Sequence, residues 1–376
     1  MNAAVAILAR LLLPISVALA GCVAPEDEEA ARVLRDIAAG AGPSELKRMT
    51  ATPERVTLRF AVGGRETVAD LYRPAEPVGA PLVLAPGLSP DGKDDARLVA
   101  LAESLARARF LVLVPDLEAA RQLRISLTDA RAIGDAAIRL AAMTEPDGFA
   151  GVGVAAVSYG VGPAFIAALD PEVEPHVSFV LGLGGYYDTD ATLTFLTTGY
   201  YRASATREWR QQRTNPAGLW VFLASNLDRI EDPADRSRLR AMAERRRSDP
   251  DASVEDLAAG LGSEGRSIYA LLTNRDPNRV PALIAGLPAA IRAELEALSL
   301  SHRDLTPLKG RAILIHGEAD SVIPYTESEA LARAIGGAEL FLVPGFSHVD
   351  RTDIGPAGQL MLIRAMRALL DRRRPS

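Results

Sequence analysis

The sequence is poor in the residues that build disulfides and metal sites. It contains one cysteine and four histidines in 376 residues, and none of the histidines lies close to another in the chain. A single cysteine excludes a disulfide within the chain, and scattered histidines do not match the spacing of zinc-binding motifs. The sequence therefore favours a chemistry that needs no bound metal.

Aromatic residues and an excess of one charge are also lacking. Aromatic residues make up 5% of the chain, and its formal net charge is −6. Nucleic-acid binding relies on basic surfaces, often with aromatic side chains for stacking, and no such stretch occurs. We therefore expect no nucleic-acid partner. The 48% hydrophobic and 24% charged fractions are those of an ordinary globular protein, long enough for one large core with a subdomain.

No apolar run at the N-terminus is long enough to span a membrane. The run from Leu11 to Ala20 follows Arg10 and is interrupted by Pro14, whereas a span needs about 20 apolar residues. One positive charge, a short apolar run and small residues before a cleavage point are typical of a secretory signal peptide. A plain signal peptide or a short membrane anchor remains an alternative.

The end of this segment, Leu19-Ala20-Gly21-Cys22, resembles the lipobox of bacterial lipoproteins. The resemblance implies that residues 1–21 are removed and that Cys22 carries a lipid. The protein would then be exported and anchored by lipid to the bacterial cell membrane or outer membrane. Residues 22–52, with an acidic stretch at 25–29 and a weak helical pattern at 30–39, are expected to form a tether.

Strand and helix patterns alternate from there on, which predicts an α/β fold. Two alternating segments flank Gly63-Gly64 and indicate an antiparallel hairpin. Continuous apolar strands separated by amphipathic helices then indicate a parallel sheet covered on both faces. In this first part of the core, residues 53–188, the expected strands are 56–62, 66–72, 81–85, 110–114, 152–157 and 177–183, and the expected helices are 98–109 and 128–143.

The alternation is interrupted once. Residues 189–306 read as mostly helical, without a convincing strand. The pattern resumes in residues 307–376, with strands at 311–316 and 339–343 and helices at 326–335 and 359–372. A helical block between two strands of a parallel sheet has the position of a cap or lid.

The segment with the most chemical information surrounds Ser158. The apolar strand at 152–157 leads into Ser158, which has Ala156 two residues before it and Gly160 two residues after it, and a helix follows at once. A strand-to-helix turn this sharp strains the serine backbone and presents its hydroxyl beside the amides that open the helix. The alternative is a glycine-rich turn with packing duties only. Ser104 has similar small neighbours but lies inside a helical pattern.

Two later strands are followed by residues that could form a catalytic triad with Ser158. Asp320 follows the strand at 311–316, and His348 follows the strand at 339–343. With Ser158, these residues come in the order serine, acid, histidine, each after a strand, as in the α/β-hydrolase fold. The chain resembles that family over residues 55–186 and 306–372. Asp188 is a rival for the acid, and each residue has a structural alternative: a surface histidine or a loop-capping aspartate.

The resemblance implies serine acyl transfer. His348 would take the Ser158 proton while Asp320 orients it, and the amides of Tyr159 and Leu88 would bind the oxyanion. No cofactor is required. The loop carrying Leu88 reads Pro86-Gly87 where many relatives have His-Gly.

We therefore expect a hydrolase that cleaves a small-molecule or lipid carboxylic ester through an acyl-enzyme. Peptidase, thioesterase or acyltransferase activity and a catalytically silent binding lipoprotein are the alternatives; a dehalogenase would need aspartate at position 158. Aromatic residues near the start of the helical block could line an acyl pocket or pack that block onto the core. Five arginines in residues 238–247 could attract an anion, although a solvated helix face is the simpler interpretation.

Overall fold

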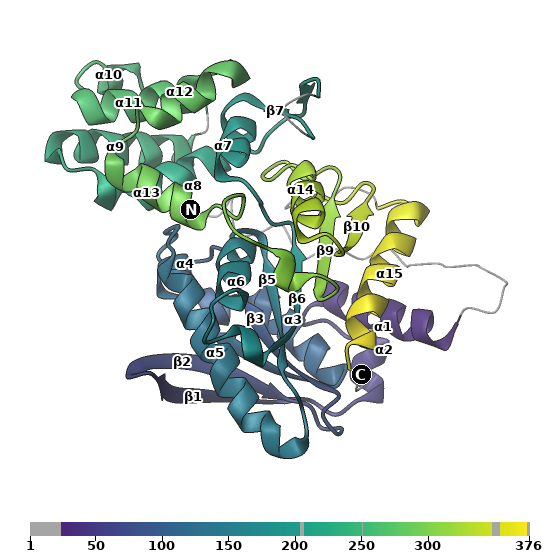
Figure 1. Cartoon of the computed structure of the whole chain (residues 1–376). Coiled ribbons are helices and arrows are strands. Elements are labelled where there is room, and N and C mark those ends of the chain that lie inside the picture. Colours follow the sequence, from purple (N-terminus) through teal and green to yellow (C-terminus); the bar gives the residue numbers. More distant parts are fainter. Residues whose placement is uncertain (1–23, 204–206, 250, 348–353, 374–376) are drawn as a thin grey trace.

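An eight-stranded sheet forms the centre of the molecule (Figure 1). The computed structural model describes residues 24–203, 207–249, 251–347 and 354–373. The strand order is β1-β2-β4-β3-β5-β6-β9-β10. The hairpin of β1 (Glu54–Val62) and β2 (Arg65–Arg73) is antiparallel, and β2 pairs antiparallel with β4. All other neighbours in this sheet are parallel.

The parallel strands coincide closely with the expected apolar segments because both faces of the sheet are covered. In β3, Val83 packs into one apolar cluster, whereas Leu82 and Leu84 pack into a second cluster on the other face. Burial on both faces removes the alternation of polar and apolar residues. The parallel strands are β3 (Ala80–Ala85), β4 (Phe110–Pro115), β5 (Val152–Val157), β6 (Val177–Leu183), β9 (Ala312–Gly317) and β10 (Glu339–Val343).

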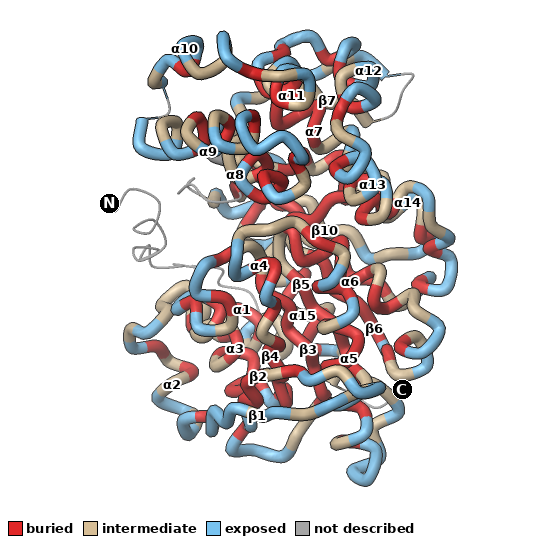
Figure 2. The backbone as a smooth tube through the Cα atoms, turned by 90° about the vertical axis from the view of Figure 1, so that its left-hand side faces the viewer, coloured by how far each residue is buried: buried red, intermediate tan, exposed pale blue. Residues whose placement is uncertain are grey.

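Helices complete the two layers around the sheet. One face is covered by α5 (Thr128–Thr144), α6 (Val161–Ala168) and α14 (Thr326–Ile335). The other is covered by α1 (Pro25–Ala39), α3 (Ala96–Arg107) and α15 (Pro356–Asp371). A short helix, α4 (Glu118–Arg121), follows β4. The expected doubly wound, mostly parallel sheet is therefore confirmed, and Figure 2 shows its strands as a buried interior.

The segment expected as a tether folds against the core instead. Ala30 and Val33 of α1 are fully buried, and the helix packs along α15. Asp36 of α1 accepts a hydrogen bond from the hydroxyl of Ser104 in α3 at 2.7 Å, and Lys47 of α2 (Glu45–Met49) pairs with the same carboxylate. The acidic start of α1 suits a helix N-terminus, where carboxylates interact favourably with the helix dipole. These contacts make residues 25–49 part of the folded body.

The helical block lies between β6 and β9 and has an apolar cluster of its own. It contains a pair of two-residue strands that the sequence did not suggest, β7 (Tyr200–Tyr201) and β8 (Arg210–Gln211). None of the helices in the described part of the chain is both long and apolar enough to cross a membrane. The helices of this insertion are α7 (Thr189–Thr198), α8 (Ala217–Asn226), α9 (Pro233–Ser248), α10 (Glu255–Ala258), α11 (Ser263–Thr273), α12 (Val280–Ala285) and α13 (Ala289–Leu298).

The insertion lies over the carboxyl ends of the parallel strands (Figure 1). Two core loops that follow strands contact it. Ile125, after β4, and Val322, after β9, pack against both the core cluster and the cluster of the insertion. The Gln212 side-chain amide donates to the Asp320 carbonyl at 2.9 Å, and the Asn215 amide donates to the Ser321 carbonyl at 2.8 Å. The insertion is thus attached at the sheet edge where the expected site lies.

Candidate active site

Ser158 occupies a strained turn between β5 and α6. Its φ is +55°, and among the described residues only Arg109 and Leu123 share a positive φ without being glycine. The turn is a short 3-10 segment, Ser158–Gly160, that leads directly into α6. Backbone strain of this kind costs on the order of 1–3 kcal/mol and persists only where the surroundings enforce it. The structure therefore has the turn geometry that the sequence predicted.

The loop after β3 enforces the turn by close approach. A methyl group on Gly160 would lie 2.5 Å from the Pro86 carbonyl oxygen, so only glycine fits there. A methyl group on Gly87 would lie 3.3 Å from the Val157 carbonyl oxygen and 3.6 Å from the Ser158 Cβ. The Pro86-Gly87 segment is therefore packed directly beside Ser158, as expected for a loop that supplies the second oxyanion donor.

Leu88 continues this loop, and the residue after it, Ser89, contacts the start of α3. The Ser89 hydroxyl donates to the Asp95 carboxylate at 2.8 Å, and Asp95 caps α3 by accepting the Arg97 amide at 3.0 Å. The Arg97 guanidinium, with these hydrogen bonds, holds the pKa of Asp95 far below its usual range. The residue that follows Leu88 is thus tied by its side chain to the start of α3.

Asp320 lies at the end of β9 in a buried, hydrogen-bonded setting. It is 3% exposed, and its Oδ1 accepts the amides of Val322 and Ile323 at 2.8 and 2.9 Å. Its Oδ2 lies 3.4 Å from Nε2 of His316. Two amides and an imidazole fix the carboxylate orientation, which suits an acid that must hold another side chain in place.

Asp188, the rival acid, has a different task. Its carboxylate caps α7 by accepting the amides of Asp190 and Ala191 at 2.8 and 3.1 Å. The backbone amide of Asp188 is held in turn by Glu327 at 2.7 Å. An N-cap stabilises a helix by about 1 kcal/mol, so this position of Asp188 is explained by the start of the insertion.

The described part of the chain includes the buried histidine beside Asp320 but not the histidine expected as the base. His348 lies outside the described residues, which stop at Ser347 on the loop after β10. Cys22 lies outside them as well. His316 is fully buried, with Nδ1 2.7 Å from the Ser328 hydroxyl and Nε2 2.9 Å from the Ile323 carbonyl oxygen, which indicates a structural role. A carbonyl only accepts, so Nε2 of His316 carries the proton.

The structure adds Glu327, a buried carboxyl that the sequence analysis missed. Glu327 lies on α14, is 4% exposed, and accepts the amides of Tyr187 and Asp188 at 3.0 and 2.7 Å. Burial away from water raises its pKa to about 7. The available signal was its spacing, because Glu327 lies four residues before Leu331 and eight before Ile335, on the buried face of α14.

A second missed group contacts the side chain of the residue after Ser158. Asp129 on α5 is 2% exposed, and burial raises its pKa to about 7. It lies 3.4 Å from the Tyr159 hydroxyl, which donates to the Ser126 carbonyl at 2.8 Å. Burial also raises the pKa of the Tyr159 phenol well above its usual value. The residue that follows Ser158 is therefore anchored through its side chain.

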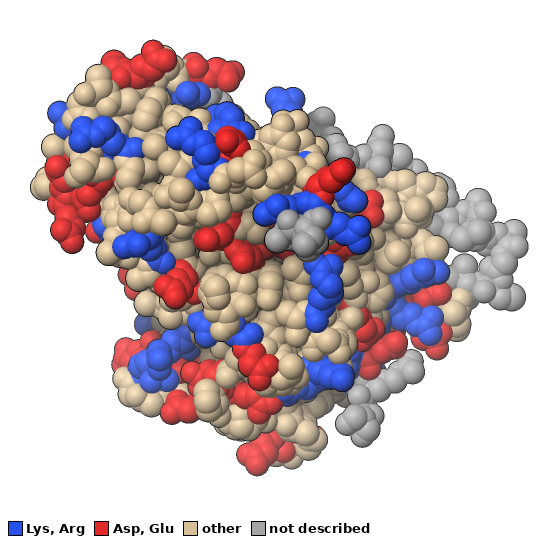
Figure 3. Space-filling model, turned by 45° about the horizontal axis from the view of Figure 1, so that its top comes forward, with Lys and Arg blue, Asp and Glu red and all other residues tan. Residues whose placement is uncertain are grey.

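The aromatic and arginine clusters of the insertion are largely engaged in packing. Phe195 is fully buried and contacts Tyr201 edge-on at 5.7 Å between ring centroids. Arg245 pairs with Asp256, and the Arg246 guanidinium lies 5.5 Å from the centroid of the Trp220 ring. On the face shown in Figure 3, acidic and basic side chains are interspersed over both the insertion and the core. This distribution favours a solvated, mixed surface over an anion-binding patch.

Comparison with known proteins identifies the fold. No family model matches the chain, and no curated protein matches its sequence. A provisionally assigned hydrolase from Legionella pneumophila subsp. pneumophila str. Philadelphia 1 has a similar structure, with a TM-score of 0.53 and 11% identity over 85% of this chain and 88% of that one. With the observed sheet order and the turn at Ser158, this similarity shows that the chain has the α/β-hydrolase fold.

Other solved structures resemble it more distantly. A puromycin-hydrolyzing peptidase of Mycobacterium tuberculosis is 14% identical, with a TM-score of 0.47, over 85% of this chain but 39% of that one. A serine hydrolase of Cycloclasticus zankles is also 14% identical, with a TM-score of 0.43, over 84% of this chain and 96% of that one. The chain thus spans less than half the length of the peptidase.

Glu327 predicts a dependence of stability on pH. Its folded-state pKa of about 7 exceeds the ordinary glutamate pKa of 4.5, so the folded state retains a proton that the unfolded state releases. Stability from this group is present below pH 4.5 and is lost as the pH rises through 7. The wild type should therefore lose stability between pH 5 and pH 8, whereas Glu327→Gln should not lose it from this position. The free energy of unfolding of Glu327→Gln minus that of wild type should increase by up to about 3 kcal/mol from pH 5 to pH 8. Urea unfolding at both pH values measures the difference. Glu329→Gln on the same helix is the control, and an unchanged difference for Glu327→Gln would contradict the assignment.

Proposed function

We propose that the protein is a serine hydrolase that cleaves a carboxylic ester through an acyl-enzyme intermediate. The observation that carries the proposal is the left-handed backbone of Ser158 at the β5–α6 turn, against which the Pro86-Gly87 loop is packed. A strained serine that is surrounded by backbone amides at the end of a central strand is the arrangement that acyl transfer needs. The buried, oriented carboxylate of Asp320 supports it, because Asp320 follows β9, which lies two strands from β5 in the sheet.

In the proposed reaction, Ser158 attacks the acyl carbon while neutral His348 accepts the hydroxyl proton. Asp320 orients His348 and stabilises the imidazolium that forms. The amides of Tyr159 and Leu88 bind the oxyanion of the tetrahedral intermediate, and one such donor contributes about 3–4 kcal/mol to transition-state stabilisation. His348 then protonates the leaving alcohol, and water releases the acyl group by the same steps. The reaction needs no cofactor.

The insertion lies over the strand ends and would act as a cap that selects the substrate. The half-buried aromatic residues Tyr200, Tyr201 and Trp220 are its candidates for contact with an apolar acyl chain. The same serine chemistry also serves peptidases, thioesterases and acyltransferases, and a fold of this kind can bind without catalysing. Ester hydrolysis is our first choice among these.

The serine chemistry is tested by covalent labelling. A fluorophosphonate probe should label the wild type and should fail to label Ser158→Ala, because only an activated serine displaces fluoride at a useful rate. Ser237→Ala, an exposed serine on α9, is the matched control and should label like wild type. Absence of labelling in correctly folded wild type, or persistent labelling of Ser158→Ala, would contradict the proposal.

The substrate class is tested with the same protein. A series of p-nitrophenyl esters from acetate to palmitate should show turnover that depends on chain length. A labelled but inactive enzyme across the whole series would favour the peptidase, thioesterase or acyltransferase alternatives. An unlabelled, inactive protein would favour the binding lipoprotein.

The choice of acid is tested by a pair of matched variants. Asp320→Asn should lower kcat by about 10³-fold or more, because an amide no longer holds the histidine in the required tautomer. Asp188→Asn removes a charge from the helix cap alone and should leave kcat within about threefold, since asparagine also caps helices well. Steady-state ester hydrolysis measures both. The opposite ranking would make Asp188 the acid.

We also propose that Cys22 carries a lipid that holds the protein at a bacterial membrane, outside the cytoplasm. Helix α1 starts at Pro25 and packs on the core, so an anchor at Cys22 would hold the folded body close to the membrane. In cell fractionation, wild type should sediment with membranes and Cys22→Ser should not. Membrane association of Cys22→Ser would argue against lipidation.

A further inference from the structure

The loop between α4 and α5 contains a three-residue segment that touches both the Ser158 turn and the insertion. We call residues 125–127 the bridging segment. Ser126, at its centre, is 8% exposed. Its amide donates to the Tyr159 hydroxyl at 2.7 Å, and that hydroxyl donates back to the Ser126 carbonyl at 2.8 Å. The side chain of the residue after Ser158 therefore satisfies both backbone groups of Ser126.

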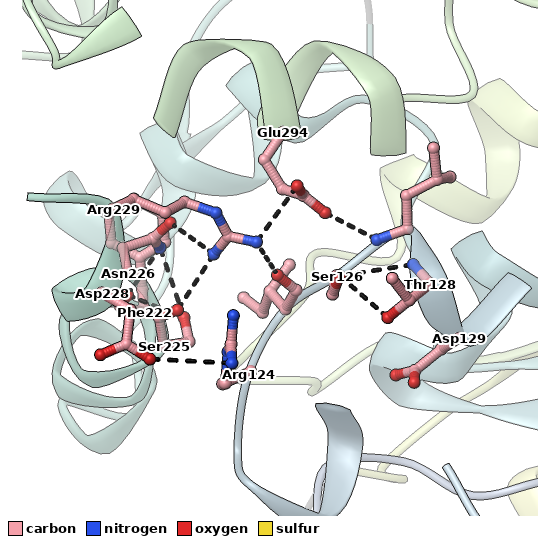
Figure 4. A network of polar contacts seen from close by, with 12 residues as sticks. Arg124, Ser126, Thr128, Asp129, Phe222, Ser225, Asn226, Asp228, Arg229 and Glu294 are labelled. Atoms are coloured by element: carbon pink, nitrogen blue, oxygen red, sulfur yellow. Dashed lines mark hydrogen bonds and ion pairs between the residues drawn. The ribbon is translucent and has the colours of Figure 1, made fainter. Parts of the chain in front are cut away.

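The insertion holds the two flanking residues. Arg229, at the end of the turn after α8, donates from Nη2 to the Ile125 carbonyl at 2.9 Å. Glu294 of α13 accepts the Leu127 amide at 2.6 Å. Arg229 and Glu294 also pair with each other at 3.1 Å, with side chains only 12% and 21% exposed. Figure 4 shows the Arg229–Glu294 pair and its contacts with the segment.

The Arg229–Glu294 pair is itself fixed within the insertion. Arg229 donates from Nη1 to the Ser225 carbonyl at 3.0 Å and to Oδ1 of Asn226 at 3.2 Å, and both of these residues are buried. Hydrogen bonds that involve a charged partner are stronger than neutral ones, especially away from water. A displacement of α8 or α13 must therefore move residues 125–127 or break several charge-assisted bonds.

We propose that Arg229 and Glu294 are positioning residues that couple the insertion to the nucleophile turn. They hold the bridging segment, the segment holds the Tyr159 phenol, and the phenol fixes the backbone of Tyr159, whose amide is the proposed oxyanion donor. The inference rests on the proposed function for its catalytic consequence. The mechanical link from Arg229 to Tyr159 rests on the contacts alone.

The first arm of the test measures catalysis. Arg229→Met retains the aliphatic stem but not the donors, so kcat on the preferred ester should fall about tenfold, with KM within about threefold of wild type, because a small misplacement of a catalytic group is costly. Arg229→Lys restores a charge and a donor and should recover most of the loss. Arg245→Met, which breaks an ion pair inside the insertion, is the matched control and should keep the wild-type kcat.

A double-mutant cycle distinguishes coupling from general loosening. Tyr159→Phe removes the phenol that contacts Ser126. If the two positions act through one path, Arg229→Met combined with Tyr159→Phe should lower kcat about as much as the more damaging single change. A wild-type kcat for Arg229→Met, or a double variant whose loss is the product of the single losses, would overturn the proposal.

The second arm does not depend on activity. Hydrogen exchange of the amides at residues 158–161 should be at least about fivefold faster in Arg229→Met than in wild type or Arg245→Met, because local opening follows the loss of supporting contacts. Unchanged exchange there refutes the link whatever the activity. If wild type is not labelled by the fluorophosphonate while exchange at the turn responds to Arg229→Met, the proposed function fails and the link stands.

Discussion

The main-chain contact between the loop after β3 and the turn at Ser158 is the constraint on which the rest of the site depends. The Pro86 carbonyl oxygen occupies the space where a side chain at position 160 would lie. Small residues continue this close packing around the start of α6. A methyl group on Gly185 would lie 2.4 Å from Val161, and one on Gly162 would lie 2.0 Å from the Tyr186 hydroxyl. The first turn of α6 is therefore packed closely against the loop after β3 and the segment after β6.

That packing also explains why strain at Ser158 is tolerated. The serine cannot relax its positive φ without moving α6 or the Pro86-Gly87 loop, and both are held by the sheet. Adjacent β3 and β5 pair in register, with Ala85 opposite Ala156. The conformational cost at one residue is therefore offset by contacts of two strands and a helix, in keeping with strain that is stored at a functional site.

The sequence allowed much of the fold to be predicted because the sheet leaves a periodic signal. The apolar strands, the strained turn at Ser158 and α14 at 326–335 all follow from local patterns. The packed helix α1 was underestimated because its buried residues are two alanines, one valine and an aspartate, which give a weak apolar stripe. Contacts between residues far apart left no pattern at all: Glu294 and Leu127 are separated by 167 positions, and Glu327 and Tyr187 by 140.

The contacts that the sequence did not predict are mainly those that join the insertion to the core. The insertion has an apolar cluster of its own, whereas its connections to the core are a few apolar side chains such as Ile125 and Val322 together with polar bonds from Arg229, Glu294 and Gln212. A hydrogen bond of a charged group contributes about 1.5–3 kcal/mol and one of a neutral group such as the Gln212 amide about 0.5–1.5 kcal/mol, since water can replace either partner. Interfaces with a large polar share permit relative motion of the parts that they join. Because Arg229 and Glu294 hold residues 125–127, which contact the Tyr159 phenol, the proposed link implies that a displacement of the insertion there would also loosen the nucleophile turn.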